Sequence, residues 1–500
     1  MTNNDVPSGF LIDEYSQNKK GQILKSNDSI YHCVLNQTSI NENKNKFYIM
    51  QLIKNGSCIY HLIRYGRIGE PGKVSETAFK LEASAINAFV KQFRTKTKNK
   101  WGDDFIKYDG KYFLTEFSYE KELKKVKKQT KKISVKKIES KLEKRIQWLL
   151  ELLSDKIMMQ ESLVQLEIDT KKMPLGKIKQ SQLNDAIKLL KEVKKEITKY
   201  NRQKNTDTDK KQFYNSLVKL SDKYYTYVPY SCGRKKPPVI DTLDRLNKLN
   251  DILEELTNIA ITTKIMEQSE NTSTNTFDLV YKEINTEIKP VEMGSREWNL
   301  LSDFVINTHA PTHSFKLKPL DFYKITRSGE KDIYDKYCKN IQNRQILVHG
   351  SRMSNWVSIL QNGLMLDPSR LGVVITGKMF GYGVYFANSI SKSAQYCGSG
   401  YGTQKICLAL AEVALGDESK RINADFKLSD KTMKKEGKNS CWGLGQMTPQ
   451  TYELIDGAEL PVGKLVKSNI PGAYLRYDEK IVYDVRQFYL KYLMILEYKV

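Results

Sequence analysis

The spacing of apolar residues changes along this chain, and the changes divide it into three regions. In the middle region, residues 140–267, apolar residues recur every three to four positions, as on a helix that buries one face. Four such stripes run from Leu142 to Ile157, Leu183 to Ile197, Phe213 to Tyr224 and Leu246 to Ala260. The spacing predicts an all-α domain whose core is made by these stripes.

The first region, residues 29–120, is predicted to be mostly β with one helix. Two strand-like runs, Phe47–Ile53 and Cys58–Arg64, flank the pair Asn55-Gly56, which favours a tight hairpin turn. Ala83–Phe93 has the helical period instead, with its apolar side chains on one face. The pattern therefore predicts a small sheet packed against a single helix.

The third region, residues 276–500, mixes both periods. It opens with the strand-like run Phe277–Tyr281, and a helix is predicted around Trp298–Ile306. Ile346–Ser351 has the pattern of a short buried strand, followed by a helix with Asn355 as its N-cap. The last side chains of this strand are therefore expected at the rim of a sheet.

Polar stretches precede and separate these regions. Residues 1–28 are aperiodic and are predicted to be a disordered tail, and residues 268–275 are predicted to be a linker. Residues 121–139 are predicted to be a basic linker, because the stretch 121–145 holds eleven lysines and one arginine against three glutamates. A run of this density serves as a nuclear-import signal, a nucleic-acid patch or a solvated spacer.

The composition favours a polyanionic partner, with nucleic acid the first expectation. Lys and Arg number 81 against 58 Asp and Glu, a formal net charge of +23; a lysine-rich bias without function is the alternative. The seven cysteines form no CxxC pair, which argues against structural zinc and fits reduced thiols of the cytosol or nucleus. The chain shows neither a signal peptide nor a run of about 18 apolar residues, so we expect a soluble intracellular protein and no membrane contact.

Four motifs of the third region carry candidate chemistry. They are His349-Gly350, Gly377–Asn388, Ser391–Cys397 and Asp478–Asp484. In this order and at these separations they resemble the catalytic domain of the poly(ADP-ribose) polymerases. The resemblance implies an α+β ADP-ribosyltransferase domain over 276–500 with mainly antiparallel sheets. It also implies NAD+ as the substrate and nicotinamide as the leaving product.

The other two regions resemble companion domains of the DNA-dependent branch of this family. The run Tyr65-Gly-Arg-Ile-Gly69 resembles the WGR domain, with Tyr65 in place of the usual tryptophan. The connectors Glu167–Lys177 and Tyr225–Pro238 resemble the helical regulatory domain, which in that branch blocks NAD+ until DNA binds. The resemblance covers roughly residues 30 to 500, and it predicts a multidomain α+β protein.

The resemblance also implies roles for individual residues. Catalysis is assigned to Glu479, His349 and Tyr385, with Glu479 favouring the cationic transition state. NAD+ contacts are assigned to His349, Gly350, Ser351, Asn355, Tyr385, Lys392, Ser393 and Tyr396. Asp367–Lys378 would line the donor site and Met379 the acceptor side. No metal is expected, since His309 and His313 are separated by Pro311 and no third ligand is nearby.

DNA contacts are predicted at Tyr65, Arg67 and Trp101. An aromatic ring can stack on a base, and arginine can bind a phosphate with two donors; surface charge and core packing are the ordinary alternatives for Arg67 and Trp101. We expect damaged DNA ends or nicks as activators, protein acceptors including the chain itself, a nuclear location, and a monomer away from DNA.

The reaction's outcome stays open at this stage. Glu479 permits polymer synthesis but does not prove it, because some members with the same trio mainly add single units. The alternatives are a mono-transferase acting on protein or DNA ends, an NAD+ glycohydrolase, and a non-catalytic DNA-binding relic.

Overall fold

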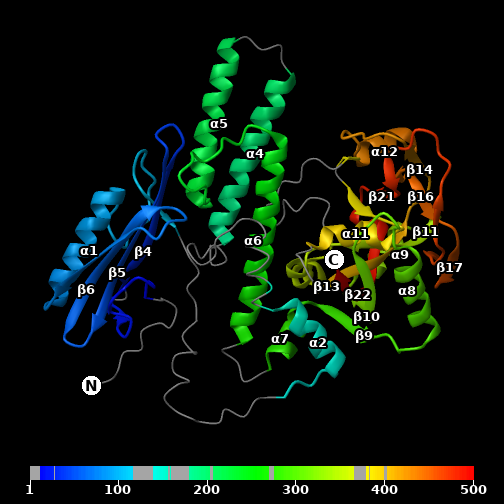
Figure 1. Ribbon diagram of the computed structural model, residues 1–500, viewed down its shortest axis with the longest axis horizontal. Helices are drawn as coiled ribbons and strands as arrows, with labels where there is room; N and C mark the ends of the chain where they lie inside the picture. Colours follow the sequence, from blue (N-terminus) through cyan, green and yellow to red (C-terminus); the bar gives the residue numbers. More distant parts are fainter. Residues whose placement is uncertain are drawn as a thin grey trace. The chain divides into compact units, whose positions relative to one another are not determined.

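The computed structural model (Figure 1) describes most of the chain. The described residues are 12–26, 29–115, 139–155, 158, 180–202, 207–269, 275–364, 379–381, 383–398 and 403–500. The chain divides into two compact units, which are considered separately. Unit 1 comprises residues 1–137 and 166–260, and unit 2 comprises residues 138–165 and 261–500.

Unit 1 contains an antiparallel sheet with the strand order β7-β6-β5-β4-β8, and β1 pairs with β5. The strands are β1 (Gln22–Ile23), β4 (His32–Ser39), β5 (Lys44–Asn55), β6 (Cys58–Arg67), β7 (Lys73–Phe79) and β8 (Phe113–Thr115). The predicted hairpin is confirmed between β5 and β6, where Gly56 has a φ of 63°. Helix α1 (Glu82–Thr97) packs Phe89 and Phe93 against one face of the sheet, as its period predicts.

The segment before this sheet differs from the predicted disordered tail. Over residues 12–26 it lies on the sheet, and Asp13 forms a buried ion pair of 2.8 Å with Arg64. The Arg64 guanidinium also contacts the rings of Tyr15 and Phe47, at 4.8 and 4.9 Å from their centres. A polar segment can thus be ordered by a few long-range pairs, and its own pattern cannot reveal them.

The predicted helices of the middle region are confirmed. They are α2 (Lys144–Leu153), α4 (Gln180–Arg202), α5 (Asp207–Tyr227) and α6 (Leu243–Ser269). Helix α2 belongs to unit 2, whereas α4 and α5 belong to unit 1. Within unit 1, α5 lies against β4, and the Asp222 carboxylate accepts a 2.7 Å hydrogen bond from the Ile40 amide.

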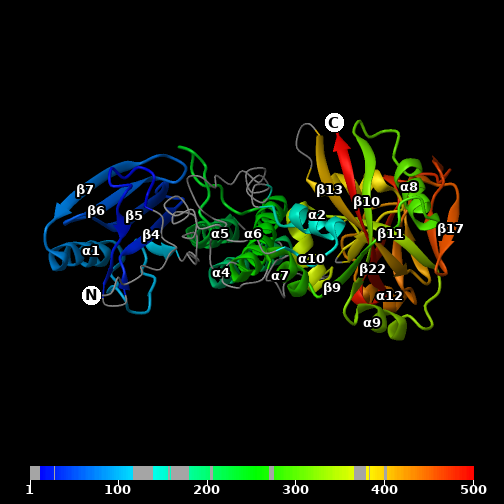
Figure 2. The ribbon, with the colours of Figure 1, turned by 90° about the horizontal axis from the view of Figure 1, so that it is seen from below.

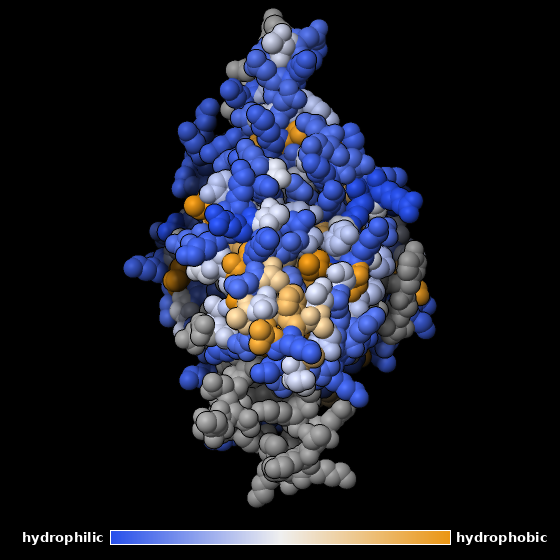
Figure 3. Space-filling model, turned by 90° about the vertical axis from the view of Figure 1, so that its left-hand side faces the viewer, coloured by the Kyte–Doolittle hydropathy of each residue, from blue (hydrophilic) through white to orange (hydrophobic). Residues whose placement is uncertain are grey.

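Figure 3 looks onto the side of the molecule that is on the left in Figure 1. Hydrophilic residues cover most of this face, and a small group of apolar side chains lies near its centre. Strand β7 is the exposed edge of the unit 1 sheet, and Val74 and Leu81 are among the large apolar residues that unit 1 exposes. A largely polar surface agrees with the composition.

Unit 2 is built on a seven-stranded sheet with the order β17-β18-β11-β13-β22-β10-β9. The strands are β9 (Thr286–Pro290), β10 (Lys316–Arg327), β11 (Arg344–Gly350), β13 (Thr403–Ala414), β17 (Tyr452–Ile455), β18 (Ala458–Pro461) and β22 (Phe488–Lys499). Figure 2 shows the central strands β13, β22 and β10 together. Only the β11–β18 pair of this sheet is parallel, which confirms the predicted, mainly antiparallel class.

A four-stranded sheet follows the order β12-β21-β15-β14. Its strands are β12 (Val384–Phe386), β14 (Glu418–Arg421), β15 (Ser440–Gly443) and β21 (Glu479–Val482). A smaller sheet contains β16 (Gly445–Pro449), β19 (Leu465–Lys467) and β20 (Leu475–Tyr477). Backbone hydrogen bonds of 2.9 and 3.0 Å between Val348 and Ala387 join the seven-stranded sheet to the end of β12.

Short helices pack on the sheets of unit 2. They are α7 (Thr276–Glu283), α8 (Arg296–Asn307), α9 (Glu330–Tyr337), α10 (Trp356–Asn362), α11 (Ile390–Ala394) and α12 (Asp430–Glu436). Helix α12 contributes Met433 to the core of the four-stranded sheet. One core contains Leu347 and Trp356, and a second contains Ile346 and Phe304. The alternation along β11 therefore feeds two cores, one on each face of the sheet.

The prediction of a strand at Phe277–Tyr281 is wrong, because this run forms helix α7. Asn275 caps the helix by accepting a 2.8 Å hydrogen bond from the Phe277 amide. Phe277, Val280, Tyr281 and Ile284 all join the same core. These positions follow the i, i+3, i+4, i+7 spacing of a helix. The predicted strand was too short a run of apolar residues to distinguish a helix from a strand.

Candidate active site

The predicted trio lies where the two sheets of unit 2 meet. His349 ends β11, Tyr385 lies in β12, and Glu479 begins β21, which pairs with β12. The His349 Nδ1 atom lies 2.9 Å from the Tyr385 carbonyl oxygen. Because a carbonyl only accepts, Nδ1 carries the hydrogen, and this bond fixes the imidazole between the sheets.

The Glu479 carboxylate is buried, with a relative exposure of 6%. Its Oε1 atom lies 2.9 Å from the Lys392 ammonium, which α11 supplies. Burial alone would lower the pKa of Lys392, but the Glu479 carboxylate and Tyr396 outweigh it, so the pKa is raised. The site therefore holds a charged ammonium beside its carboxylate.

Tyr385 is held through its hydroxyl group. The hydroxyl donates to the Gly381 carbonyl and accepts from the Phe380 amide, each at 2.9 Å. Burial raises the pKa of Tyr385, and the nearby Glu479 charge adds to the effect. The side chain is thus a neutral phenol in a fixed position, suited to shape a pocket and unsuited to act as a base.

Gly350 is required by close packing within the chain. A Cβ atom at this position would lie 2.0 Å from the Ser393 carbonyl oxygen, so any other residue would displace α11. The Ser393 hydroxyl donates to the Val348 carbonyl at 3.0 Å, and the Asn355 amide donates to the Ser351 hydroxyl at 3.0 Å. The predicted NAD+ contacts on β11 and α11 are therefore held together.

Tyr396 is the most accessible of the predicted residues of this site. Its relative exposure is 59%, and its ring centre lies 5.9 Å from the Lys392 ammonium. Met379 packs at the edge of a core cluster that also contains Tyr385. The predicted donor loop Asp367–Lys378 lies outside the described residues.

The sequence reasoning missed the buried charges on either side of Glu479. Asp478 is fully buried and accepts hydrogen bonds from the Asn388 side-chain amide at 2.9 Å and the Gly445 backbone at 2.8 Å. Lys480 is also buried and forms an ion pair with Glu418. Charged residues ordinarily indicate an exposed segment, because burying a charge is costly, so the run Asp478-Glu479-Lys480 gave no local signal of burial.

His309 and His313 lie near the site but form no recognisable metal centre. Each packs against the ring of Phe315. Burial lowers the pKa of both imidazoles. Within the described ranges, no group of three or more His, Cys, Asp or Glu side chains is arranged to hold a metal ion.

The predicted DNA contacts in unit 1 fall into different settings. Tyr65 is 43% exposed and stacks on Tyr48 at 5.7 Å. Lys96 lies 4.7 Å above the same Tyr48 ring. Trp101 instead packs edge-on against Phe89 and Phe93, both at 4.8 Å, within the core of the sheet and α1.

The Arg67 guanidinium contacts the connector between α5 and α6. It donates to the Gly233 and Lys235 carbonyls, and to the Asn43 carbonyl and side-chain oxygens at 3.0 and 2.9 Å. Most of its donors are therefore engaged within unit 1 in this structure. It joins the sheet to the helices.

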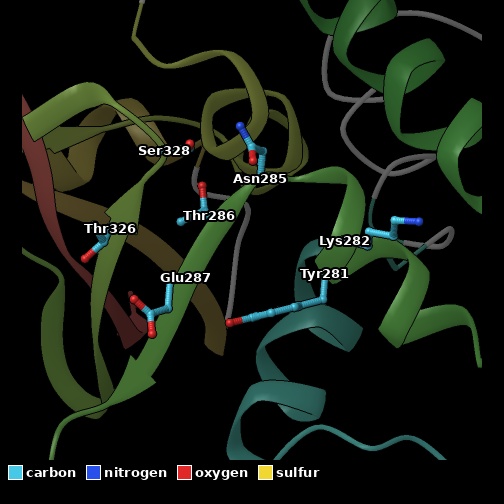
Figure 4. A pocket seen from close by; sticks show the side chains of 7 residues that line it. All are labelled: Tyr281, Lys282, Asn285, Thr286, Glu287, Thr326 and Ser328. Carbon is cyan, nitrogen blue, oxygen red and sulfur yellow. The ribbon is translucent and has the colours of Figure 1, made fainter. Parts of the chain in front are cut away.

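A separate pocket of about 470 Å³ lies beside β9 and β10 (Figure 4). The residues that line it are Tyr281, Lys282, Asn285, Thr286, Glu287, Thr326 and Ser328. None of these residues belongs to the predicted site. We therefore do not assign the dinucleotide to it.

Comparison with known proteins agrees with this geometry. Models of the poly(ADP-ribose) polymerase catalytic domain, the regulatory domain of that enzyme and the WGR domain match residues 295–498, 140–281 and 31–106. Poly(ADP-ribose) polymerase 2 of Homo sapiens is 32% identical over 96% of this chain and 81% of its own length. The chain belongs to the poly(ADP-ribose) polymerase family. It is an NAD+ ADP-ribosyltransferase.

Other members of the poly(ADP-ribose) polymerase family show similar agreement. Poly(ADP-ribose) polymerase 2-A of Oryza sativa is 33% identical over 94% of this chain and 70% of its own length. Poly(ADP-ribose) polymerase 1 of Xenopus laevis is 34% identical over 99% of this chain, which spans only 48% of that relative. Among the helices of the described residues, none is long and apolar enough to cross a bilayer.

Proposed function

We propose that this protein is a DNA-break-activated ADP-ribosyltransferase that builds poly(ADP-ribose) on itself and on other proteins. The observation that carries the proposal is the buried Glu479–Lys392 pair beside His349 and Tyr385 in a family member. The buried carboxylate suits a reaction that develops positive charge, and the relatives named above are poly(ADP-ribose) polymerases.

Each residue of the site has a proposed part in the reaction. Gly350 and Ser393 bind the nicotinamide carboxamide, and Tyr396 and Tyr385 lie on either side of the ring. His349, Ser351 and Asn355 bind the adenosine end. As the nicotinamide–ribose bond breaks, the negative charge of Glu479 stabilises the oxocarbenium-like ribose, and the same carboxylate accepts a hydrogen bond from the acceptor hydroxyl.

The ion pair with Lys392 supports this role for Glu479. The Lys392 ammonium, 2.9 Å from Glu479 Oε1, offsets part of the free-energy cost of burying this carboxylate. Lys392 also restricts the rotamers of Glu479, so the charge is already oriented when the substrate binds. We propose that Lys392 positions Glu479 and leaves its second oxygen for the ribose.

DNA binding is proposed for the unit 1 sheet. Tyr65 offers an exposed ring on a stack with Tyr48, and Lys96 and Lys98 lie above neighbouring tyrosine rings. Stacking surfaces flanked by lysine suit a broken DNA end, whose terminal base is accessible. Trp101 supports this surface from the core, so its proposed role is indirect.

Control by DNA is proposed to pass through Arg67. DNA that moves this side chain would also release the connector at Gly233 and Lys235, and so the ends of α5 and α6. The regulatory-domain match supports a gating role for these helices. We further propose a nuclear location, where damaged DNA is the available activator.

Incubation of the purified protein with labelled NAD+, with and without blunt-ended DNA, tests this function. A DNA-dependent smear on a denaturing gel that resists nuclease and disappears with protease is expected. A sharp protease-sensitive band would indicate that the enzyme adds single ADP-ribose units to protein and does not synthesise polymer. A nuclease-sensitive product would show that DNA is the acceptor, and free ADP-ribose alone would indicate a glycohydrolase.

A further inference from the structure

Lys480 is a buried cation next to the proposed catalytic carboxylate. Its relative exposure is 3%, and its ammonium lies 2.8 and 3.0 Å from the two Glu418 carboxylate oxygens. Because strand residues alternate, Lys480 lies on the face of β21 opposite to Glu479. It therefore does not enter the site described above.

The Lys480 side chain extends across two neighbouring strands. Trp442 of β15 is its register partner, and the ammonium lies 3.5 Å from the centre of the indole. Lys420 of β14 is the register partner of Trp442 on the other side, at 5.3 Å from the same indole. Glu418, the ion-pair partner, also lies in β14, so the contact connects β21, β15 and β14.

Burying this ion pair costs more free energy than burying apolar side chains in its place would. Burial lowers the pKa of Lys480, although Glu418 and Asp478 act against that effect. A buried ion pair adds little stability relative to well-packed apolar residues, but it fixes geometry because the charges tolerate only one arrangement. The benefit of this pair should therefore be sought in the position of β21.

The residue on the other side of Glu479 is held in a similar way. Asp478 is fully buried between the Asn388 amide and the Gly445 backbone amide. Both neighbours of Glu479 are thus anchored to separate strands by buried charge. Glu479 itself forms an ion pair with Lys392.

We propose that Lys480 is a positioning residue, which places Glu479 by fastening β21 to β14 across Trp442. The proposal rests on the proposed function of Glu479. A displacement of this carboxylate by a fraction of an ångström would weaken its interaction with the transition state more than it would weaken NAD+ binding. The effect should therefore fall on kcat.

The test compares two pairs of substitutions in the full chain with DNA present. The first is Lys480→Met with Glu418→Gln, which removes both charges together and leaves neither one unpaired. The matched control is Lys491→Met with Glu412→Gln, an equally buried pair of 3.0 Å between β22 and β13. For the first variant we expect kcat to fall about tenfold while KM for NAD+ stays within about twofold.

The control variant should keep kcat within about twofold of the wild type, and Lys480→Arg should recover part of the lost rate. Glu418→Gln alone keeps Lys480 over Trp442, so it should give an intermediate kcat, and it provides the test if the double variant does not fold. A wild-type kcat in the Lys480 and Glu418 variants, or an equal loss in the control, would overturn the proposal.

The proposed function can fail separately. If the wild type labels protein and Glu479→Gln does not, an unchanged kcat in the Lys480 variant overturns the positioning role of Lys480 and leaves the proposed function standing. If the wild type transfers no label from NAD+ with DNA, the proposed function fails, and the positioning role fails with it.

Discussion

The helices of unit 1 and the sheets of unit 2 differ in how they treat buried polar groups. Among the described residues, twelve buried side-chain nitrogen and oxygen atoms make no hydrogen bond, and six of them lie in α5 and α6. They belong to Tyr224, Tyr225, Asn247, Asn250 and Thr257, with both polar atoms of the Asn250 amide included. Each costs about 1–3 kcal/mol relative to a satisfied or apolar group.

In the seven-stranded sheet of unit 2, by contrast, the buried Glu412 carboxylate has several partners. Glu412 of β13 contacts the Lys491 ammonium at 3.0 Å and accepts hydrogen bonds from the hydroxyls of Tyr489 and Tyr334 at 2.7 and 3.3 Å. The comparison indicates a rigid catalytic framework and a helical element that opens at low free energy. Such an element suits a gate, because a modest binding energy is enough to open it.

The largest expected effect is on chemistry in unit 2. Glu479→Gln keeps the size of the side chain but removes the charge beside the developing cation. Polymer formation should fall at least about 100-fold, while NAD+ still binds. Labelled NAD+ on a denaturing gel measures the first effect and calorimetric titration the second; undiminished polymer would refute the role of Glu479.

The next effect is on stability in the same unit. Glu412→Leu removes the acceptor of two tyrosine hydroxyls and the buried partner of Lys491, which keeps the more exposed Asp456 at 3.1 Å. Unit 2 should therefore lose about 3 kcal/mol. Urea denaturation measures this loss of unfolding free energy, and hydrogen exchange measures it separately in β13 and β22. Lys434→Met breaks an exposed pair of 2.7 Å and should leave stability nearly unchanged; equal losses in the two variants would contradict the contrast.

Replacing a buried polar residue by leucine should stabilise the helices, whereas it should destabilise unit 2. Asn250→Leu replaces a buried amide without partners by an apolar group of similar size, so α6 should gain about 1–3 kcal/mol. A more stable gate should then need more DNA for the same activity. Lys248→Leu, on an exposed position of the same helix, is the control, and an unchanged DNA requirement in Asn250→Leu would separate stability from gating.

The smallest expected effect is a pH dependence at the contact between α5 and β4. Burial raises the pKa of Asp222 to about 6, with Ile40 and Lys107 opposing the shift. An acid whose folded pKa is raised destabilises the folded state above that pKa, and the cost is relieved as the pH falls from about 7 towards 4.

This relief should be roughly 1 kcal/mol after discounting for the partial exposure of Asp222. Asp222→Asn should remove it while retaining the hydrogen bond from Ile40. Melting temperatures of both proteins between pH 4 and 7 measure the difference. Parallel curves would show that Asp222 does not titrate in this range.

Local periods were enough to predict the hairpin of β5 and β6, the long helices and strand β11. They failed at α7, where four apolar residues in a run of five fit a strand as well as a helix. They also failed at residues 12–26, whose order depends on the pairing of Asp13 with Arg64, 51 positions away. Such pairs depend on the tertiary fold and leave no local pattern.

The candidate site shows the same limit. Motif order predicted that His349, Tyr385 and Glu479 belong together, and the structure brings them to the junction of two sheets. The contact between Lys480 and Glu418 spans 62 positions, and the Arg67 contact with Lys235 spans 168. Both depend on strand register and on packing between domains, so neither could be predicted from spacing.

Hydrogen exchange with and without a blunt-ended DNA hairpin tests the central contrast most directly. The account predicts that DNA speeds exchange in α5 and α6, leaves β13 and β22 unchanged, and protects the strand that carries Tyr65. Unchanged exchange in α5 and α6, with activity still stimulated by DNA, would contradict the proposal that these helices are the gate.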